Sequence, residues 1–107
     1  MKKNIREAAR VIRSKNAGPF ELTFDVILSD EKWYDYFISH DILNREKICE
    51  IFKIQPERIL SIVHFKPANA IKFTIKRERV SGAPGETDIY GAQQHAPLLD
   101  LEFEYTE

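Results

Sequence analysis

The sequence predicts one small α+β domain on a ferredoxin-like split βαβ plan, with a mostly antiparallel sheet, an extra N-terminal element and a long glycine-rich loop. The length of 107 residues is that of a single domain, and 43% hydrophobic with 31% charged residues is a globular composition. Segments that alternate apolar and polar residues flank a central region with helical spacing. We therefore expect residues 1–107 to fold as one unit.

The first residues fit either a helical turn or a strand. Asn4 and Glu7 have the spacing of a capping box, which favours the start of a helix. Val11 and Ile12 are β-branched, which favours a strand. In both cases the segment is expected to lead into a loop at residues 14–19.

The clearest strand is predicted at residues 20–29, where apolar and polar side chains alternate. Ser29 is then expected to cap a helix with an acidic first turn. Trp33 and Phe37 are four residues apart and should share the buried face of that helix.

A second helix is predicted to begin after Asn44. Leu43 and Ile48 flank Asn44 in the pattern of a hydrophobic staple around an N-cap. Pro56 marks the end of this helical region.

The remaining chain predicts three strands and one long loop. Residues 58–66 and 70–79 are strands joined by a turn of hairpin length. Residues 80–97 are rich in glycine and small polar side chains without a sustained period, which predicts a loop. Alternation over residues 99–105 predicts a closing strand.

Composition excludes several classes of function. The 16 basic and 17 acidic residues leave a formal net charge of −1, so no global field attracts nucleic acid or an anionic membrane. Cys49 has no disulfide partner, no signal peptide is recognisable, and the apolar runs are far shorter than the ~20 residues that cross a bilayer. A cytoplasmic location is expected. His40, His64 and His95 lack metal-ligand spacing, and no nucleotide fingerprint occurs, so no metal or other cofactor is predicted.

One candidate site precedes the clearest strand. It combines two cations, Arg13 and Lys15, with Ser14, Asn16 and Gly18. Backbone amides near a glycine and the guanidinium fork of Arg13 would suit a carboxylate or phosphate. The alternative is a solvated turn with incidental charge.

Asp25 is unusual because an ionised carboxylate inside an apolar strand is costly unless it is paired. Its face of the strand could pack against something polar. Alternatively, Asp25 pairs across strands with Lys72 or Arg77 on an exposed face.

A second candidate site lies in the predicted long loop. Its amide, hydroxyl and imidazole groups could hydrogen-bond a ligand or a neighbouring subunit, or the loop could cap the core of its own domain. Because both candidate segments leave from strand ends, we expect residues 13–16 to lie near residues 93–95. The candidate residues of the loop are Asp88, Tyr90, Gln93, Gln94 and His95.

The runs ARVIRSKNAGPFELT at residues 9–23, VSG at 80–82 and GAQQHAPLLD at 91–100 resemble the AtuA-related family, long labelled a domain of unknown function. The resemblance spans nearly the whole chain. That family is similar to the C-terminal ferredoxin-fold domain of AtuA-like proteins, named for acyclic terpene utilisation. There an Arg-Ser-Gly-Asp-Lys-Gly loop takes this place. The present chain keeps Arg13, Ser14 and Gly18, with Lys15-Asn16-Ala17 between them.

The resemblance implies a bacterial cytoplasmic protein that works with a larger AtuA-like protein in the catabolism of acyl-CoA or organic acids. It implies no catalytic roles, so the expected function is that of a non-catalytic or site-completing subunit with an anionic small molecule as a possible ligand. Two alternatives stay open. One is a free-standing enzyme on a carboxylated metabolite, with Asp88 or His95 as acid or base. The other is a purely structural oligomer.

Two further expectations concern binding. The domain should self-associate, because its apolar strands form a sheet whose edges need cover. Arg13→Ala should change the free energy of unfolding by no more than about 0.5 kcal/mol, as for a solvated arginine, and abolish binding of the ligand or partner.

Overall fold

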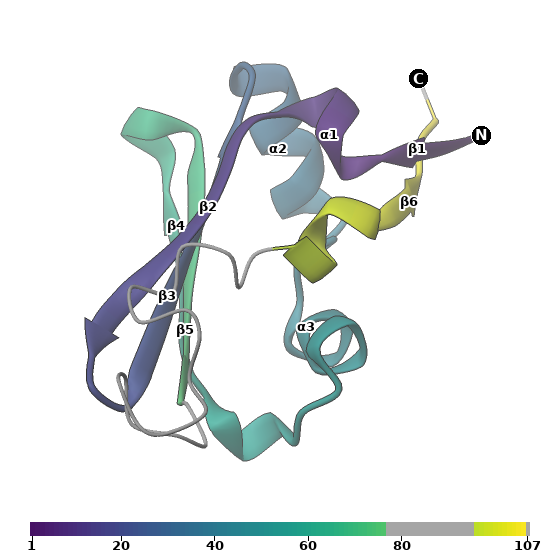
Figure 1. Cartoon of the computed structure of the whole chain (residues 1–107). Coiled ribbons are helices and arrows are strands. Elements are labelled where there is room, and N and C mark those ends of the chain that lie inside the picture. The colour runs from purple at the N-terminus through teal and green to yellow at the C-terminus, as the bar shows by residue number, and fades with distance from the viewer. Residues whose placement is uncertain (77–95, 107) are drawn as a thin grey trace.

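The computed structural model describes residues 1–76 and 96–106 of the chain. Within them, the helices lie to one side of a four-stranded sheet, and the two chain ends meet in a separate small sheet (Figure 1). The strands are β1 (Lys2–Asn4), β2 (Ala9–Gly18), β3 (Glu21–Leu28), β4 (Ile59–Phe65), β5 (Ala70–Lys76) and β6 (Glu102–Glu104). The α-helices are α1 (Ile5–Ala8), α2 (Glu31–Ser39) and α3 (Arg45–Phe52), and the 3-10 turns are η1 (Pro56–Arg58), η2 (Lys66–Ala68) and η3 (Ala96–Asp100).

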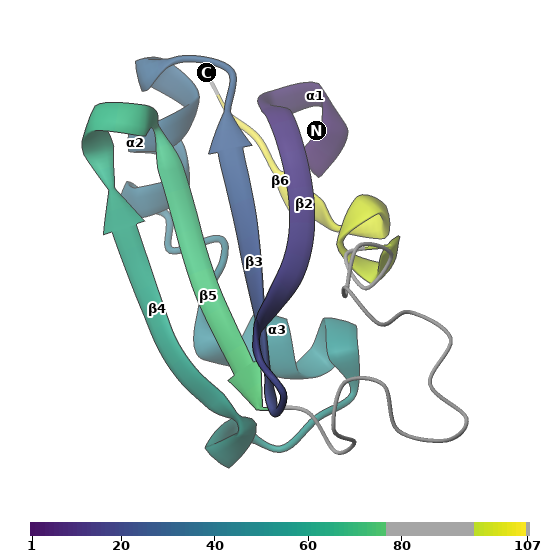
Figure 2. The same ribbon diagram turned by 60° about the vertical axis from the view of Figure 1, so that its left-hand side comes forward.

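The four-stranded sheet confirms the split βαβ plan. Its order is β2-β3-β5-β4, and every neighbouring pair is antiparallel. β3 and β4 therefore run parallel with β5 between them, and α2 and α3 form the crossover. β2, the extra N-terminal element, lies beside β3 at one edge of the sheet (Figure 2).

The N-terminal residues form first a helix and then a strand. The capping box is confirmed, because Asn4 Oδ1 accepts a hydrogen bond from the Arg6 backbone N–H and Glu7 Oε2 accepts one from the Asn4 N–H, both at 2.8 Å. The loop predicted at residues 14–19 is wrong, because β2 continues as far as Gly18. Its last residues have weak strand propensity, so pairing with β3 rather than local sequence keeps them extended.

Carboxylate and amide caps set the start of the two longer helices. Ser29 was predicted to cap α2, but its backbone N–H donates to the Ala8 carbonyl at 2.8 Å and holds it at the strand end. Asp30 is the cap instead, because its Oδ1 accepts from the Trp33 N–H at 3.0 Å. Asn44 caps α3 as predicted.

The closing segment differs from the predicted strand at residues 99–105. Only Glu102–Glu104 is strand, and η3 precedes it. Leu98 and Leu101 are the buried leucines, and their spacing of three is that of a 3-10 turn. β6 then pairs with β1 rather than with the main sheet.

The core fills the space between the helices and one face of the sheet. Phe24 stacks on Phe73 with ring centroids 4.8 Å apart, and Phe52 of α3 lies 4.9 Å from Phe24. Phe37 is buried as predicted, whereas Trp33 is only half-buried. No described helix covers the opposite face of the sheet, which we call the open face (Figure 1).

Candidate functional site

The open face carries three adjacent rows of side chains, each crossing all four strands. Along the strands the rows change from polar to charged to apolar. The polar row is Lys15, Thr23, Thr74 and Ser61, the charged row is Arg13, Asp25, Lys72 and Val63, and the apolar row is Val11, Ile27, Ala70 and Phe65.

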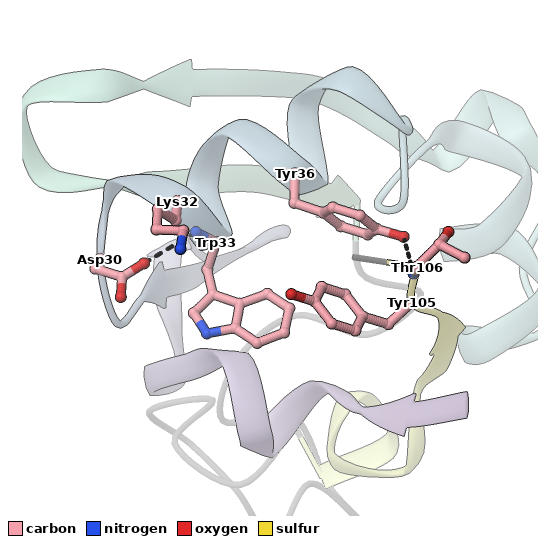
Figure 3. Close-up of a pocket in the computed structure, with 6 residues that line it drawn as sticks. All are labelled: Asp30, Lys32, Trp33, Tyr36, Tyr105 and Thr106. Atoms are coloured by element: carbon pink, nitrogen blue, oxygen red, sulfur yellow. Dashed lines mark hydrogen bonds between the residues drawn. The ribbon is translucent and has the colours of Figure 1, made fainter. Parts of the chain in front are cut away.

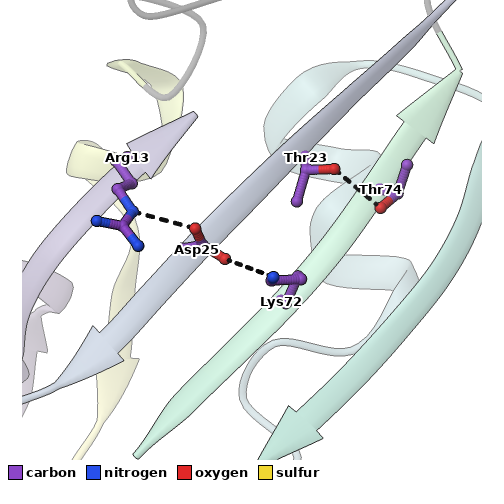
Figure 4. A network of polar contacts seen from close by, with 5 residues as sticks. All are labelled: Arg13, Thr23, Asp25, Lys72 and Thr74. Atoms are coloured by element: carbon purple, nitrogen blue, oxygen red, sulfur yellow. Dashed lines mark hydrogen bonds and ion pairs between the residues drawn. The ribbon is translucent and has the colours of Figure 1, made fainter. Parts of the chain in front are cut away.

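Asp25 stands at the centre of the charged row and is only 5% exposed (Figure 4). Its Oδ2 accepts a hydrogen bond from Arg13 Nε at 3.1 Å, and its Oδ1 lies 3.7 Å from Lys72 Nζ. The pairing with Lys72 confirms the cross-strand alternative, although Asp25 itself is buried. The pairing with Arg13 was not predicted. Two cations and one carboxylate leave this cluster with a formal charge of +1.

A hollow of about 300 Å³ joins the charged row to the apolar row. The side chains of Arg13, Asp25 and Lys72 border it. Its walls are mostly hydrocarbon, and part of that hydrocarbon is left in contact with solvent. The apolar lining is Ile27, Val63, Phe65, Ala68 and Ala70, of which Phe65 is 54% and Val63 48% exposed.

The candidate residues on β2 do not form one cradle, because a strand sends successive side chains to opposite faces. Arg13 and Lys15 belong to the open face. Ser14 and Asn16 pair with core-facing positions of β3, and Ser14 is 7% exposed. Gly18 ends β2 with a φ of +151°, a conformation that side chains rarely adopt, although nothing lies within 4 Å of a Cβ built there.

The candidate residues Asp88, Tyr90, Gln93, Gln94 and His95 lie outside the described residues. Arg77, the second suggested partner of Asp25, lies outside them as well. The expected proximity of residues 13–16 and 93–95 therefore stays a prediction.

Sequence reasoning missed the apolar half of the site. Val63 and Phe65 are two residues apart, so in a strand both side chains point to the same face, which then carries apolar groups. Asp25 and Ile27 are two residues apart on β3, so both were expected on one face. The register that aligns them with positions on β2, β5 and β4 could not be predicted from the sequence.

A second hollow, of about 590 Å³, lies between α2 and the C-terminal residues (Figure 3). Trp33, Tyr36 and Tyr105 line it, and the rings of Trp33 and Tyr105 are 5.0 Å apart. The Tyr36 hydroxyl donates to the Glu104 carbonyl at 2.8 Å and accepts from the Thr106 N–H at 3.2 Å. These polar groups fasten the C-terminal strand, so we place the candidate site on the open face.

Two classes of site have no support within residues 1–76 and 96–106. No group of three or more His, Cys, Asp and Glu side chains there could hold a metal ion. No helix in the same part of the chain is long and apolar enough to cross a membrane.

Comparison with known proteins identifies a family but no characterised relative. The family model described as "Domain of unknown function (DUF4387)" matches residues 5–102. No curated protein and no solved structure matches the chain. The match names no AtuA-like protein, so that resemblance stays a prediction. Because the match runs from α1 to the first residue of β6, the chain belongs to the DUF4387 family.

Proposed function

We propose that this chain is a binding module that holds a small carboxylate with an apolar body on the open face of its sheet. The observation that carries the proposal is the cluster of formal charge +1 at the border of an apolar hollow of about 300 Å³. A monoanion would neutralise the cluster, and its hydrocarbon part would cover Ile27 and Phe65. Neither a dianion nor a neutral apolar molecule matches both halves of the site.

The Arg13 guanidinium is well placed for such a ligand. Its Nε donates to Asp25 Oδ2, and no hydrogen bond from its two terminal nitrogens occurs within the described residues. Figure 4 shows the contact to Asp25 leaving from Nε, with one terminal nitrogen directed away from Asp25. Asp25 thus orients the guanidinium, while the side chain stays 61% exposed and can donate two parallel hydrogen bonds to a carboxylate.

The proposal is tested by calorimetric titration with three probes. Hexanoate has both a carboxylate and an apolar body, hexanamide lacks the charge and acetate lacks the body. We expect hexanoate to bind and both of the other probes to bind at least about tenfold more weakly, which corresponds to ~1.4 kcal/mol. Equal binding of hexanamide and hexanoate would contradict a role for the charged row.

Two lysines of β5 provide a matched pair of variants. Lys72 borders the hollow, whereas Lys76 is an exposed lysine of the same strand outside its lining. Lys72→Ala should weaken hexanoate binding by about tenfold, and Lys76→Ala should leave it unchanged. Equal losses in both variants would mean that the ligand senses only the general charge of the sheet.

We further propose that the module acts in the cytoplasm as an accessory subunit of a larger AtuA-like protein, in the catabolism of acyl-CoA or organic acids. The support is the resemblance of residues 9–23, which include all of β2 and therefore Arg13. The test is purification of the tagged protein from its native host. A large AtuA-like chain that co-purifies with it supports the subunit role, and its repeated absence contradicts this role but not carboxylate binding.

A further inference from the structure

β4 is an outer strand of the four-stranded sheet. β5 pairs with one side of it, and no strand among the described residues pairs with its other side. An outer strand presents a row of backbone N–H and C=O groups that can pair with another chain. Proteins that must remain monomeric protect such an edge with charged side chains, proline or bulges.

The two edges of this sheet differ in protection. β2 carries the charged residues Arg10, Arg13 and Lys15, and its pairing with β3 is interrupted by two register shifts. β4 is seven residues long and contains no Asp, Glu, Lys or Arg, in a chain that is 31% charged. Its single register shift lies at its start, so the ladder from Ser61 to Phe65 is regular.

β4 also exposes apolar side chains. Leu60 and Val63 are each 48% exposed, and Phe65 is 54% exposed. In the described part of the chain, only two other large apolar residues, Met1 and Phe20, are exposed to this degree. A strand side that no described strand pairs with and exposed hydrocarbon therefore coincide on β4, which is typical of an interaction edge.

We propose that β4 pairs with β4 of a second copy of this chain, antiparallel about a two-fold axis, so that two four-stranded sheets become one. A strand bearing charges would have to bring them against Leu60 and Val63, whereas a second β4 is equally uncharged. The symmetric arrangement covers both β4 edges at once, and the charged β2 edges stop further growth. The net charge of −1 gives little repulsion between copies.

The arrangement has a consequence for the open face. A two-fold axis perpendicular to the sheet leaves the open faces of both copies on the same side. Val63 and Phe65 line the hollow and also belong to β4, so the two hollows would lie close to the dimer axis. The dimer does not depend on what the hollow binds, and its test uses residues outside the hollow.

The test is sedimentation equilibrium at micromolar concentration on the wild-type chain and three lysine variants. Leu60→Lys and His64→Lys each place a charge at an exposed position of β4 outside the lining of the hollow. Ala17→Lys is the control, at an exposed position on the opposite edge strand. We expect a wild-type dimer, a dimer for Ala17→Lys, and dissociation constants raised at least about tenfold for both β4 variants, because each variant brings a lysine charge against the uncharged β4 of the second copy.

Hydrogen exchange identifies the strand that pairs. Amide exchange in β4 should slow as the wild-type concentration rises, and this dependence should be lost in Leu60→Lys. Circular dichroism verifies that the variants are folded. A monomeric wild type overturns the proposal, as does a dimer that both β4 variants retain. Open-ended oligomers, or protection of β2 instead of β4, overturn the two-fold arrangement.

Discussion

At the scale of single residues, the contacts of Asp25 change how Arg13 is understood. A carboxylate that is 5% exposed has lost most of its hydration and depends on Arg13 and Lys72 for compensation. The two cations are 61% and 51% exposed and keep much of their own hydration. The two kinds of loss therefore differ in cost. Removal of a cation leaves the buried carboxylate less compensated, whereas removal of the carboxylate leaves two cations that water still solvates.

Arg13→Ala should therefore destabilise the fold, contrary to the expectation for a solvated arginine. The free energy of unfolding should fall by about 1–3 kcal/mol, because Asp25 then keeps only the longer contact to Lys72. Asp25→Asn removes the buried charge and should cost less in the Arg13→Ala background than in the wild type. Urea unfolding of the two single variants and the double variant measures both effects. Arg13→Ala within about 0.5 kcal/mol of wild type would mean that water already screens the pair.

At the scale of elements, structure that depends on local signals was predictable from the sequence. The cap and staple at Asn44, the capping box at Asn4 and the alternation of β3 each involve residues a few positions apart. β2 was missed beyond Arg13, because its extended form depends on a ladder with β3. The turn η3 was missed because Leu99 and Leu101 fit the alternation of a strand, whereas the residues that are buried are Leu98 and Leu101, three positions apart.

The cap of α3 offers a direct test at this scale. Asn44 Oδ1 accepts from the Lys47 N–H at 2.7 Å, and its Nδ2 donates to the Asp41 carbonyl at 3.0 Å. Asn44→Ala removes both bonds and should lower the free energy of unfolding by about 1–2 kcal/mol. Asn44→Asp retains the acceptor and should cost less than half as much. Thermal and urea unfolding compare the two variants. Equal losses in the free energy of unfolding would mean that the bond from Asn44 Nδ2 to the Asp41 carbonyl, rather than the cap, supplies the stability.

At the scale of the whole molecule, the predicted fold class was correct, while the candidate site depended on the register. Arg13 was identified from its residue type, but its partner Asp25 lies on β3, and the second cation that pairs with Asp25, Lys72, lies on β5. Bulges next to Ala9 and Gly18 decide which side chains of β2 meet those of β3. A shift of one residue would move Arg13 to the core face, and no local pattern reveals that choice.

The pairing of the two chain ends has a consequence for the order of folding. The amino group of Met1 lies 3.7 Å from Glu104 Oε1 as an ion pair, and the Tyr105 N–H donates to the Met1 carbonyl at 2.8 Å. Helix α1, with Ile5 fully buried, meets η3 from the other end of the chain. Contacts so distant in sequence close the longest loop in the molecule, so they should form after the folding transition state.

Phe103→Leu tests this order, because Phe103 of β6 is 6% exposed and packs its ring 5.0 Å from that of Phe37. A loss of about 1 kcal/mol there should appear as a roughly fivefold faster unfolding rate with nearly unchanged refolding. Phe24→Leu, in the stacked pair of the main sheet, should instead slow refolding. Stopped-flow kinetics in urea separates the two rates. On this order, a chain that is still being synthesised can assemble its main sheet but cannot bury α1 until η3 and β6 have been synthesised.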